Sequence, residues 1–241
     1  MRIYLLRHGV TPYNKKKIIQ GHLDIPLSEE GEAQAGETAG LLLTELEENG
    51  LHICRIFSSD LSRAARTAQI LEEAMKEKGI ALPAVIHRKD LREIYLNSWE
   101  GKSKKELLED LEEDGTSLFQ KWLERPAEVV PDGAESMPSF YYRSIDALSD
   151  IMDKLKNCDE TGSVAVIYSH GGFLSMIRNY LNGREPASFI AFAHPNAGGM
   201  VFDVDLSCYR GGRFEPSMVT NFRQFPGDFD PVINLPDAAV V

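Results

Sequence analysis

The stretch Arg2-Ile-Tyr-Leu-Leu-Arg7, followed directly by His8-Gly9, decides the fold class. Its centre is an almost unbroken apolar run, which is typical of a strand buried on both faces of a sheet. Residues 163–168 form a second run of this kind, and it stops at Ser169-His170-Gly171-Gly172. Two buried strands that each end in a histidine predict a sheet whose carboxyl edge carries reactive side chains.

Strand and helix patterns alternate over most of the remaining chain, which predicts an α/β fold with an open, mostly parallel sheet flanked by helices. Ser28 is expected to cap a helix that has glutamates in its first turn and ends near Asn49-Gly50. Ser58-Ser59-Asp60 is expected to cap another helix. Further strands are expected at residues 53–57, 84–87, 200–206 and 218–222, the last two as a C-terminal hairpin at the sheet edge.

The length of 241 residues suits one domain. We expect a single domain over residues 1–223, with a small helical insertion at about residues 102–135. The capping-box sequence Ser103-Lys-Lys-Glu106 predicts a helix start inside this insertion. Residues 224–241 contain three prolines and little periodicity, so a surface tail is expected there.

Composition and charge exclude several classes of protein. Lys and Arg number 26 against 37 Asp and Glu, a net charge of −11, which argues against nucleic acid or an anionic membrane as the main partner. No apolar run approaches the length of a membrane-spanning helix. The three cysteines are far apart and predict neither a disulfide framework nor a zinc site. We expect a cytoplasmic monomer or homodimer without metal or cofactor.

Two arginines and two histidines are expected at the carboxyl edge of the sheet: Arg7, His8, Arg63 and His170. Arginine forks match phosphate oxygens, and a neutral imidazole can act as a nucleophile or as an acid or base near pH 7. Taken alone, a histidine at a strand end is more often a hydrogen-bonded loop residue. No P-loop, no His-Glu-x-x-His, no Gly-x-Ser-x-Gly and no Gly-x-Gly-x-x-Gly sequence is present.

The order of these residues resembles the histidine phosphatase superfamily, in its phosphoglycerate-mutase-like branch, which includes broad-specificity and α-ribazole phosphatases. The similarity covers about residues 3–172 and consists of the following blocks: Leu-Leu-Arg7-His8-Gly9-Val-Thr11-Pro-Tyr-Asn14, Gln20-Gly21-His-Leu-Asp24-Ile-Pro26-Leu27-Ser28-Glu29-Glu-Gly31, Ser58-Ser59-Asp60-Leu61-Ser-Arg63-Ala64-Ala-Arg66-Thr67-Ala68, Leu91-Arg92-Glu93-Ile94 with Trp99-Glu100-Gly101, Gly133-Ala-Glu135-Ser136 and Ser169-His170-Gly171-Gly172.

The resemblance implies a metal-independent phosphomonoesterase that acts on small phosphorylated metabolites through a phosphohistidine. It implies that His8 is the nucleophile and Glu93 the proton donor, with Arg7, Arg63 and His170 completing the catalytic set. The implied phosphate-binding residues are Arg7, Asn14, Gln20, Gly21, Arg63, His170 and Gly171. One departure is Asn97, where the family commonly has glycine; asparagine tolerates a left-handed backbone, so the turn can persist.

Three other functions stay open. A phosphocarrier protein, in which His8 hands phosphate to a partner, would leave Glu93 with little purpose. A phosphoglycerate mutase must hold a second phosphate, yet residues 106–124 contain seven acidic residues and one lysine, and this disfavours a mutase. A catalytically silent module that binds phosphorylated ligands is expected to lack the nucleophile or the proton donor, and both His8 and Glu93 are present.

Overall fold

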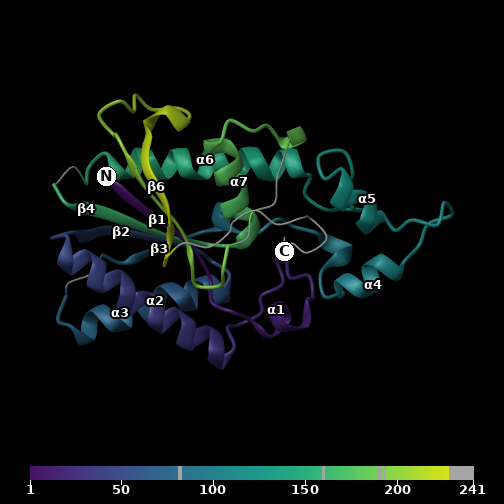
Figure 1. Ribbon diagram of the computed structural model, residues 1–241, viewed down its shortest axis with the longest axis horizontal. Coiled ribbons are helices and arrows are strands. Elements are labelled where there is room, and N and C mark those ends of the chain that lie inside the picture. Colours follow the sequence, from purple (N-terminus) through teal and green to yellow (C-terminus); the bar gives the residue numbers. More distant parts are fainter. Residues whose placement is uncertain (81–82, 159–160, 189–191, 193, 228–241) are drawn as a thin grey trace.

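The computed structural model describes residues 1–80, 83–158, 161–188, 192 and 194–227, and these form a six-stranded sheet between two layers of helices (Figure 1). Strands β3, β2, β4 and β1 are parallel neighbours, whereas β5 and β6 continue the sheet in antiparallel pairing. In sheet order they are β3 (Val85–Arg88), β2 (His52–Ser59), β4 (Ser163–Ser169), β1 (Arg2–Arg7), β5 (Gly199–Val204) and β6 (Val219–Phe225). The predicted open, mostly parallel sheet with an edge hairpin is confirmed.

Two long helices cover each face of the sheet (Figure 1). One face packs against α2 (Glu29–Glu48) and α3 (Ser62–Glu77), and the other against α6 (Met137–Leu155) and α7 (Gly171–Leu181). Three shorter helices complete the described set: α1 (Pro12–Lys16), α4 (Lys104–Glu109) and α5 (Leu118–Glu124). Helices α4 and α5 project beyond the end of the sheet, so the predicted helical insertion is present.

The apolar run of β1 supplies both hydrophobic cores. Ile3 and Leu5 belong to the core under α6 and α7, whereas Tyr4 and Leu6 belong to the core under α2 and α3. Successive side chains of a strand point to opposite faces, so a central strand covered on both sides needs apolar residues at every position. This is why the segment has no polar alternation.

Most helices begin at a residue whose side chain caps the first turn. The Ser28 hydroxyl accepts a hydrogen bond from the Gly31 amide at 3.1 Å and caps α2 as expected. Ser103 and Glu106 form the predicted capping box at the start of α4. The insertion is anchored by buried aromatic rings, since Trp122 lies 5.7 Å from Trp99 between ring centroids.

Two sequence-based expectations need correction. Ser58-Ser59-Asp60 does not cap α3, because β2 continues to Ser59 and the helix starts after Leu61, which makes no side-chain cap bond. The tail does not begin at residue 224, because β6 extends to Phe225 and pairs with β5. Phe225 is buried against Tyr4, which holds the strand end in place. The rest of the predicted tail, from residue 228, lies outside the described residues.

None of the described helices is both long and apolar enough to cross a bilayer. Cys54, Cys158 and Cys208 are free thiols. The described residues contain no cluster of three or more histidine, cysteine, aspartate or glutamate side chains arranged to hold a metal ion.

Candidate active site

Neighbouring parallel strands bring the two predicted histidines together. Arg7, the last residue of β1, is in register with Ser169, the last residue of β4, so His8 and His170 leave the sheet side by side. Their ring centroids are 5.1 Å apart. The carboxyl edge of the sheet therefore carries two imidazoles in contact, as expected for the position of a site in such a fold.

His8 is buried with its tautomer defined by the backbone. Its Nδ1 lies 2.7 Å from the carbonyl oxygen of Gly9, and because a carbonyl can only accept, Nδ1 carries the proton and Nε2 has the lone pair. Burial, together with the positive charges of Arg63 and Arg7, keeps the pKa of His8 well below its usual value. The ring is consequently neutral at physiological pH and has the electronic form of a nucleophile.

Arg7 and Arg63 are buried cations held by backbone carbonyls. Arg7 donates from Nη1 to the carbonyl of His194 at 2.9 Å, and Arg63 donates from Nη1 and Nη2 to the carbonyls of Leu23 and Gly21, each at 2.8 Å. Burial lowers the pKa of Arg63 to about 10, so it stays charged. Within the described part of the chain, the buried Nε–H of each arginine has no acceptor. Two oriented donors are thus available for the oxygens of an anion.

Glu93 is a buried carboxyl beside these cations. Its Oε2 accepts from the amide of Gly172 at 2.9 Å and its Oε1 from the amide of Ile94 at 3.0 Å. Burial raises the pKa of Glu93, although the two amides, Arg63 and Arg7 act in the opposite direction. A carboxyl with a raised pKa can donate a proton nearer neutral pH than an exposed glutamate can.

Glu93 and Arg7 leave little room for a side chain at Gly171 and Gly172. A Cβ on Gly172 would lie 2.2 Å from Oε1 of Glu93, and one on Gly171 would lie 3.3 Å from Cζ of Arg7.

His170 precedes the two glycines as the N-cap of α7, and its Nε2 lies 2.9 Å from the hydroxyl of Ser59. Burial and the nearby cations lower the pKa of His170 well below its usual value. Because α7 begins directly after His170, the N-terminus of this helix adds a partial positive charge to the site.

Asn14 and Gln20 meet at the Thr11 hydroxyl, which lies 3.0 Å from Oδ1 of Asn14 and 2.8 Å from Oε1 of Gln20. Asn196 joins this group to the site, because its Nδ2 donates to the carbonyl of His8 at 3.2 Å and lies 3.5 Å from Oδ1 of Asn14. Gly21 has a supporting place, since its carbonyl holds Arg63. The structure thus brings Asn14 and Gln20 to the rim of the site.

Sequence reasoning missed several residues that support this site. The Nε2 of His22 donates to the carbonyl of Glu93 at 2.8 Å. Thr67 accepts from the Gly9 amide at 3.2 Å and donates to the Arg63 carbonyl at 2.7 Å. His22 stands inside a motif that resembles the family, which is a usable signal. Thr67 likewise stands inside a block that resembles the family, residues 58–68. Asn196 carries no such signal, because only the folded chain places it next to His8.

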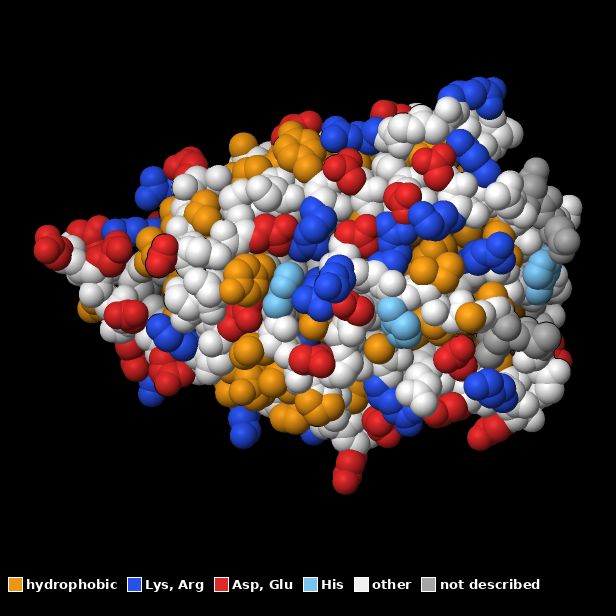
Figure 2. All heavy atoms as spheres, turned by 180° about the vertical axis from the view of Figure 1, so that it is seen from behind, with side chains coloured by type: hydrophobic (Ala, Val, Ile, Leu, Met, Phe, Trp, Pro, Cys, Tyr) orange, Lys and Arg blue, Asp and Glu red, His pale blue; other side chains and the backbone are white. Residues whose placement is uncertain are grey.

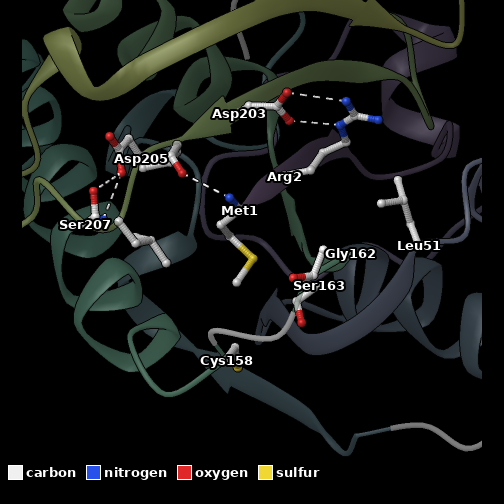
Figure 3. Close-up of a pocket in the computed structure, with 12 residues that line it drawn as sticks. Met1, Arg2, Leu51, Cys158, Gly162, Ser163, Asp203, Asp205 and Ser207 are labelled. Carbon is white, nitrogen blue, oxygen red and sulfur yellow. Dashed lines mark hydrogen bonds and ion pairs between the residues drawn. The ribbon is translucent and has the colours of Figure 1, made fainter.

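A cavity of about 490 Å³ lies at the other end of the sheet, where β1 and β4 begin (Figure 3). It is lined by Arg2, Cys158 and Asp203, among others, and Arg2 donates from Nε to Oδ1 of Asp203 at 2.9 Å. Six residue steps of β1 separate Arg2 from His8, roughly 20 Å at the rise of a strand. This cavity is therefore distinct from the candidate active site and contains none of its side chains.

The chain is similar to several known proteins. The chain is 34% identical to metal-independent phosphoserine phosphatase of Arabidopsis thaliana, over 73% of this chain and 66% of that protein. It is 31% identical to a probable phosphoglycerate mutase of Cronobacter sakazakii, over 76% and 75% of the two chains. A structure of mycobacterial glucosyl-3-phosphoglycerate phosphatase with VO3 superimposes with a TM-score of 0.68 and 26% identity, over 93% of this chain and 97% of that one.

The family model of the histidine phosphatase superfamily, branch 1, matches residues 3–211. This match runs from the start of β1, through the insertion, to the segment beyond β5, so it includes every candidate site residue described above. The chain therefore belongs to the histidine phosphatase superfamily.

Proposed function

We propose that this protein is a metal-independent phosphomonoesterase that forms a phosphohistidine on His8. The observation that carries the proposal is the arrangement around His8: a neutral imidazole with its lone pair on Nε2, next to two buried arginines that each have an unused N–H. Phosphoryl transfer requires positioning and neutralisation of the equatorial oxygens more than covalent assistance. Arg7 and Arg63 supply that positive charge from the chain itself.

In the first step, Nε2 of His8 attacks phosphorus, and the bond from phosphorus to the alcohol oxygen of the substrate breaks. Glu93 transfers its proton to that leaving oxygen, so a neutral alcohol departs and a carboxylate remains. The two arginines neutralise the charge of the equatorial oxygens during the transfer, and the neutral ring of His170 adds a hydrogen-bond donor. The raised pKa of Glu93 favours this role, because the carboxyl must be protonated before the reaction.

In the second step, the Glu93 carboxylate takes a proton from a water molecule. The water oxygen bonds to phosphorus and the bond from phosphorus to Nε2 breaks, which releases inorganic phosphate. His8 is neutral again and Glu93 is protonated again, so the cycle closes without another reactant. The burial of Glu93 beside the two arginines supports a single carboxyl in both roles.

Small phosphorylated metabolites are the proposed substrates. Two of the relatives are named for phosphoserine and glucosyl-3-phosphoglycerate, which are both small phosphate esters. The strong negative net charge argues against large polyanions as substrates, whereas the local cations Arg7 and Arg63 suit one phosphate group.

A phosphoglycerate mutase is the second candidate, since one relative is named as a probable enzyme of this kind. The charge of residues 106–124, a part of the insertion, opposes it. Lys121, the one lysine of residues 106–124, is paired with Glu112 and with Asp114, the latter at 2.6 Å. Figure 2 shows acidic side chains gathered at the end of the molecule that α4 and α5 form. Residues 106–124 therefore offer no unpaired lysine or arginine for a second phosphate, which favours hydrolysis over mutase chemistry.

The test is phosphate release from p-nitrophenyl phosphate and from a panel of sugar, glycerate, serine and nucleotide monophosphates, all with chelator present. The native chain is compared with His8→Ala and with the control His87→Ala, which removes an exposed histidine of β3. We expect turnover in chelator for the native chain and the control, and none for His8→Ala.

The absence of hydrolysis for every ester would refute the phosphatase proposal. Interconversion of 2- and 3-phosphoglycerate by the same preparation would then identify a mutase. If that reaction also failed, binding of phosphate esters without turnover would identify the silent binding module.

A further inference from the structure

The segment that carries Glu93 has little regular structure of its own. It lies between two single-turn 3-10 helices, Lys89–Leu91 and Asn97–Trp99, and pairs with no strand of the sheet. A general acid must keep its carboxyl within hydrogen-bond distance of the leaving oxygen, so something else must fix this backbone. The hydrogen bonds of its carbonyl groups show which residues fix this backbone.

Arg143 of α6 holds the segment through three of its backbone carbonyls. Its Nη1 donates to the carbonyls of Asp90 and Arg92 at 2.8 and 2.9 Å, and its Nη2 donates to the carbonyl of Glu93 at 3.1 Å. The same guanidinium donates from Nε and Nη2 to the two carboxylate oxygens of Glu135 at 2.8 and 2.7 Å. All five N–H donors of Arg143 are therefore used.

Glu135 also bonds to the other side of the segment. Its amide donates to the carbonyl of Tyr95 at 2.8 Å, and its Oε2 accepts from the Tyr95 amide at 3.3 Å. Asn97, the residue that replaces the usual glycine, has a φ of 43° and donates from Nδ2 to the carbonyl of Asp132 at 2.9 Å. Residues 132–135, the exit of the insertion, are thus joined directly to the backbone that follows Glu93, and through Arg143 to the backbone that precedes it.

We infer that Arg143 and Glu135 are positioning residues that hold Glu93 for proton transfer to the leaving oxygen. The inference rests on the proposed function, in which Glu93 is the proton donor. A planar guanidinium can reach three carbonyls and a carboxylate at once, whereas a lysine ammonium has three donors and no fixed fork. A displacement of the reacting group by about 1 Å can cost roughly 100-fold in rate. The bonds of Arg143 and Glu135 that fix the backbone around Glu93 are therefore expected to affect the rate of proton transfer strongly.

The experiment measures kcat/KM for two substrates that differ in their need for a general acid. An alkyl monophosphate such as phosphoserine expels a strongly basic alkoxide and requires protonation, whereas p-nitrophenyl phosphate expels a weakly basic phenolate. For Arg143→Met we expect kcat/KM on phosphoserine to fall about 10- to 100-fold, and on p-nitrophenyl phosphate by less than about threefold. Arg143→Lys and Glu135→Gln are expected to show the same pattern with smaller losses.

The matched control is Arg66→Met. The side chain of Arg66 pairs with Glu32 and Glu73, and neither of these residues belongs to the Glu93 segment. Thermal unfolding of each variant distinguishes a folded protein from a damaged one, and Arg143→Lys and Glu135→Gln retain polar contacts if Arg143→Met unfolds.

Equal losses on the two substrates, or no loss on either, in folded variants of an active enzyme would overturn the inference alone. A native chain inactive on both substrates would overturn the proposed function and the inference with it. A loss confined to the alkyl ester supports the inference, because a general weakening of the fold does not depend on the basicity of the leaving group.

Discussion

Gly172→Ala is the substitution that most directly tests the placement of Glu93. A Cβ at this position would lie 2.2 Å from Oε1 of Glu93, and also 3.2 Å from Cε1 of Phe140. Ordinary contact begins at about 3.4 Å, so the carboxyl must retreat by about 1 Å. The Gly172 amide, which now donates to Oε2 at 2.9 Å, loses its geometry at the same time.

The expected magnitude follows from this displacement. A shift of about 1 Å in a reacting group corresponds to a loss of roughly 100-fold, or about 2.7 kcal/mol in the activation free energy. The fold should survive, because Gly172 is helical and alanine is a better helix former than glycine by about 1 kcal/mol. The loss should therefore appear in catalysis and not in stability.

The assay is kcat/KM on phosphoserine and on p-nitrophenyl phosphate for native and Gly172→Ala protein, with thermal unfolding in parallel. The alkyl ester should show the roughly 100-fold loss and the nitrophenyl ester a much smaller one. If Gly172→Ala hydrolyses phosphoserine within about threefold of the native rate, then Glu93 is not held as described and the reasoning is refuted.

Three further predictions follow from the same site. The activity of the native enzyme should fall as pH rises through the raised pKa of Glu93, and should persist at acidic pH because the lowered pKa of His8 keeps that ring neutral; a pH profile in which Glu93→Gln retains the alkaline fall would contradict this assignment. Glu93→Gln should accumulate phosphorylated protein on p-nitrophenyl phosphate, because water lacks its base in the second step, and mass spectrometry should detect about one added phosphoryl group. Gly36→Ala, in the middle of α2 with no atom within 4 Å of the new Cβ, should stabilise the protein by about 0.5–1 kcal/mol with unchanged activity, and a lowered midpoint of thermal unfolding would disagree.

Much of the fold was predictable because its determinants are local. The run of residues 2–7 predicted a strand buried on both faces, and Ser28 and Ser103 predicted helix starts, since apolar periodicity and capping depend on neighbours in sequence. The cap expected at Ser58-Ser59-Asp60 was wrong because sheet pairing extended β2 through Ser59. Pairing between strands distant in sequence overrides a local preference of this kind.

The candidate site, like the fold, was predictable from the sequence only in part. The sequence by itself determined that Arg7 ends a buried strand, that His8 and His170 follow such strands, and that Arg63 lies at the same edge of the sheet. Motif resemblance added Glu93. Only the tertiary structure decided which tautomer His8 adopts, and which arginine holds the backbone of Glu93, because Arg143 is fifty residues away along the chain. Such contacts depend on how α6 packs beside an irregular segment, and side-chain packing between distant elements leaves no period in the sequence.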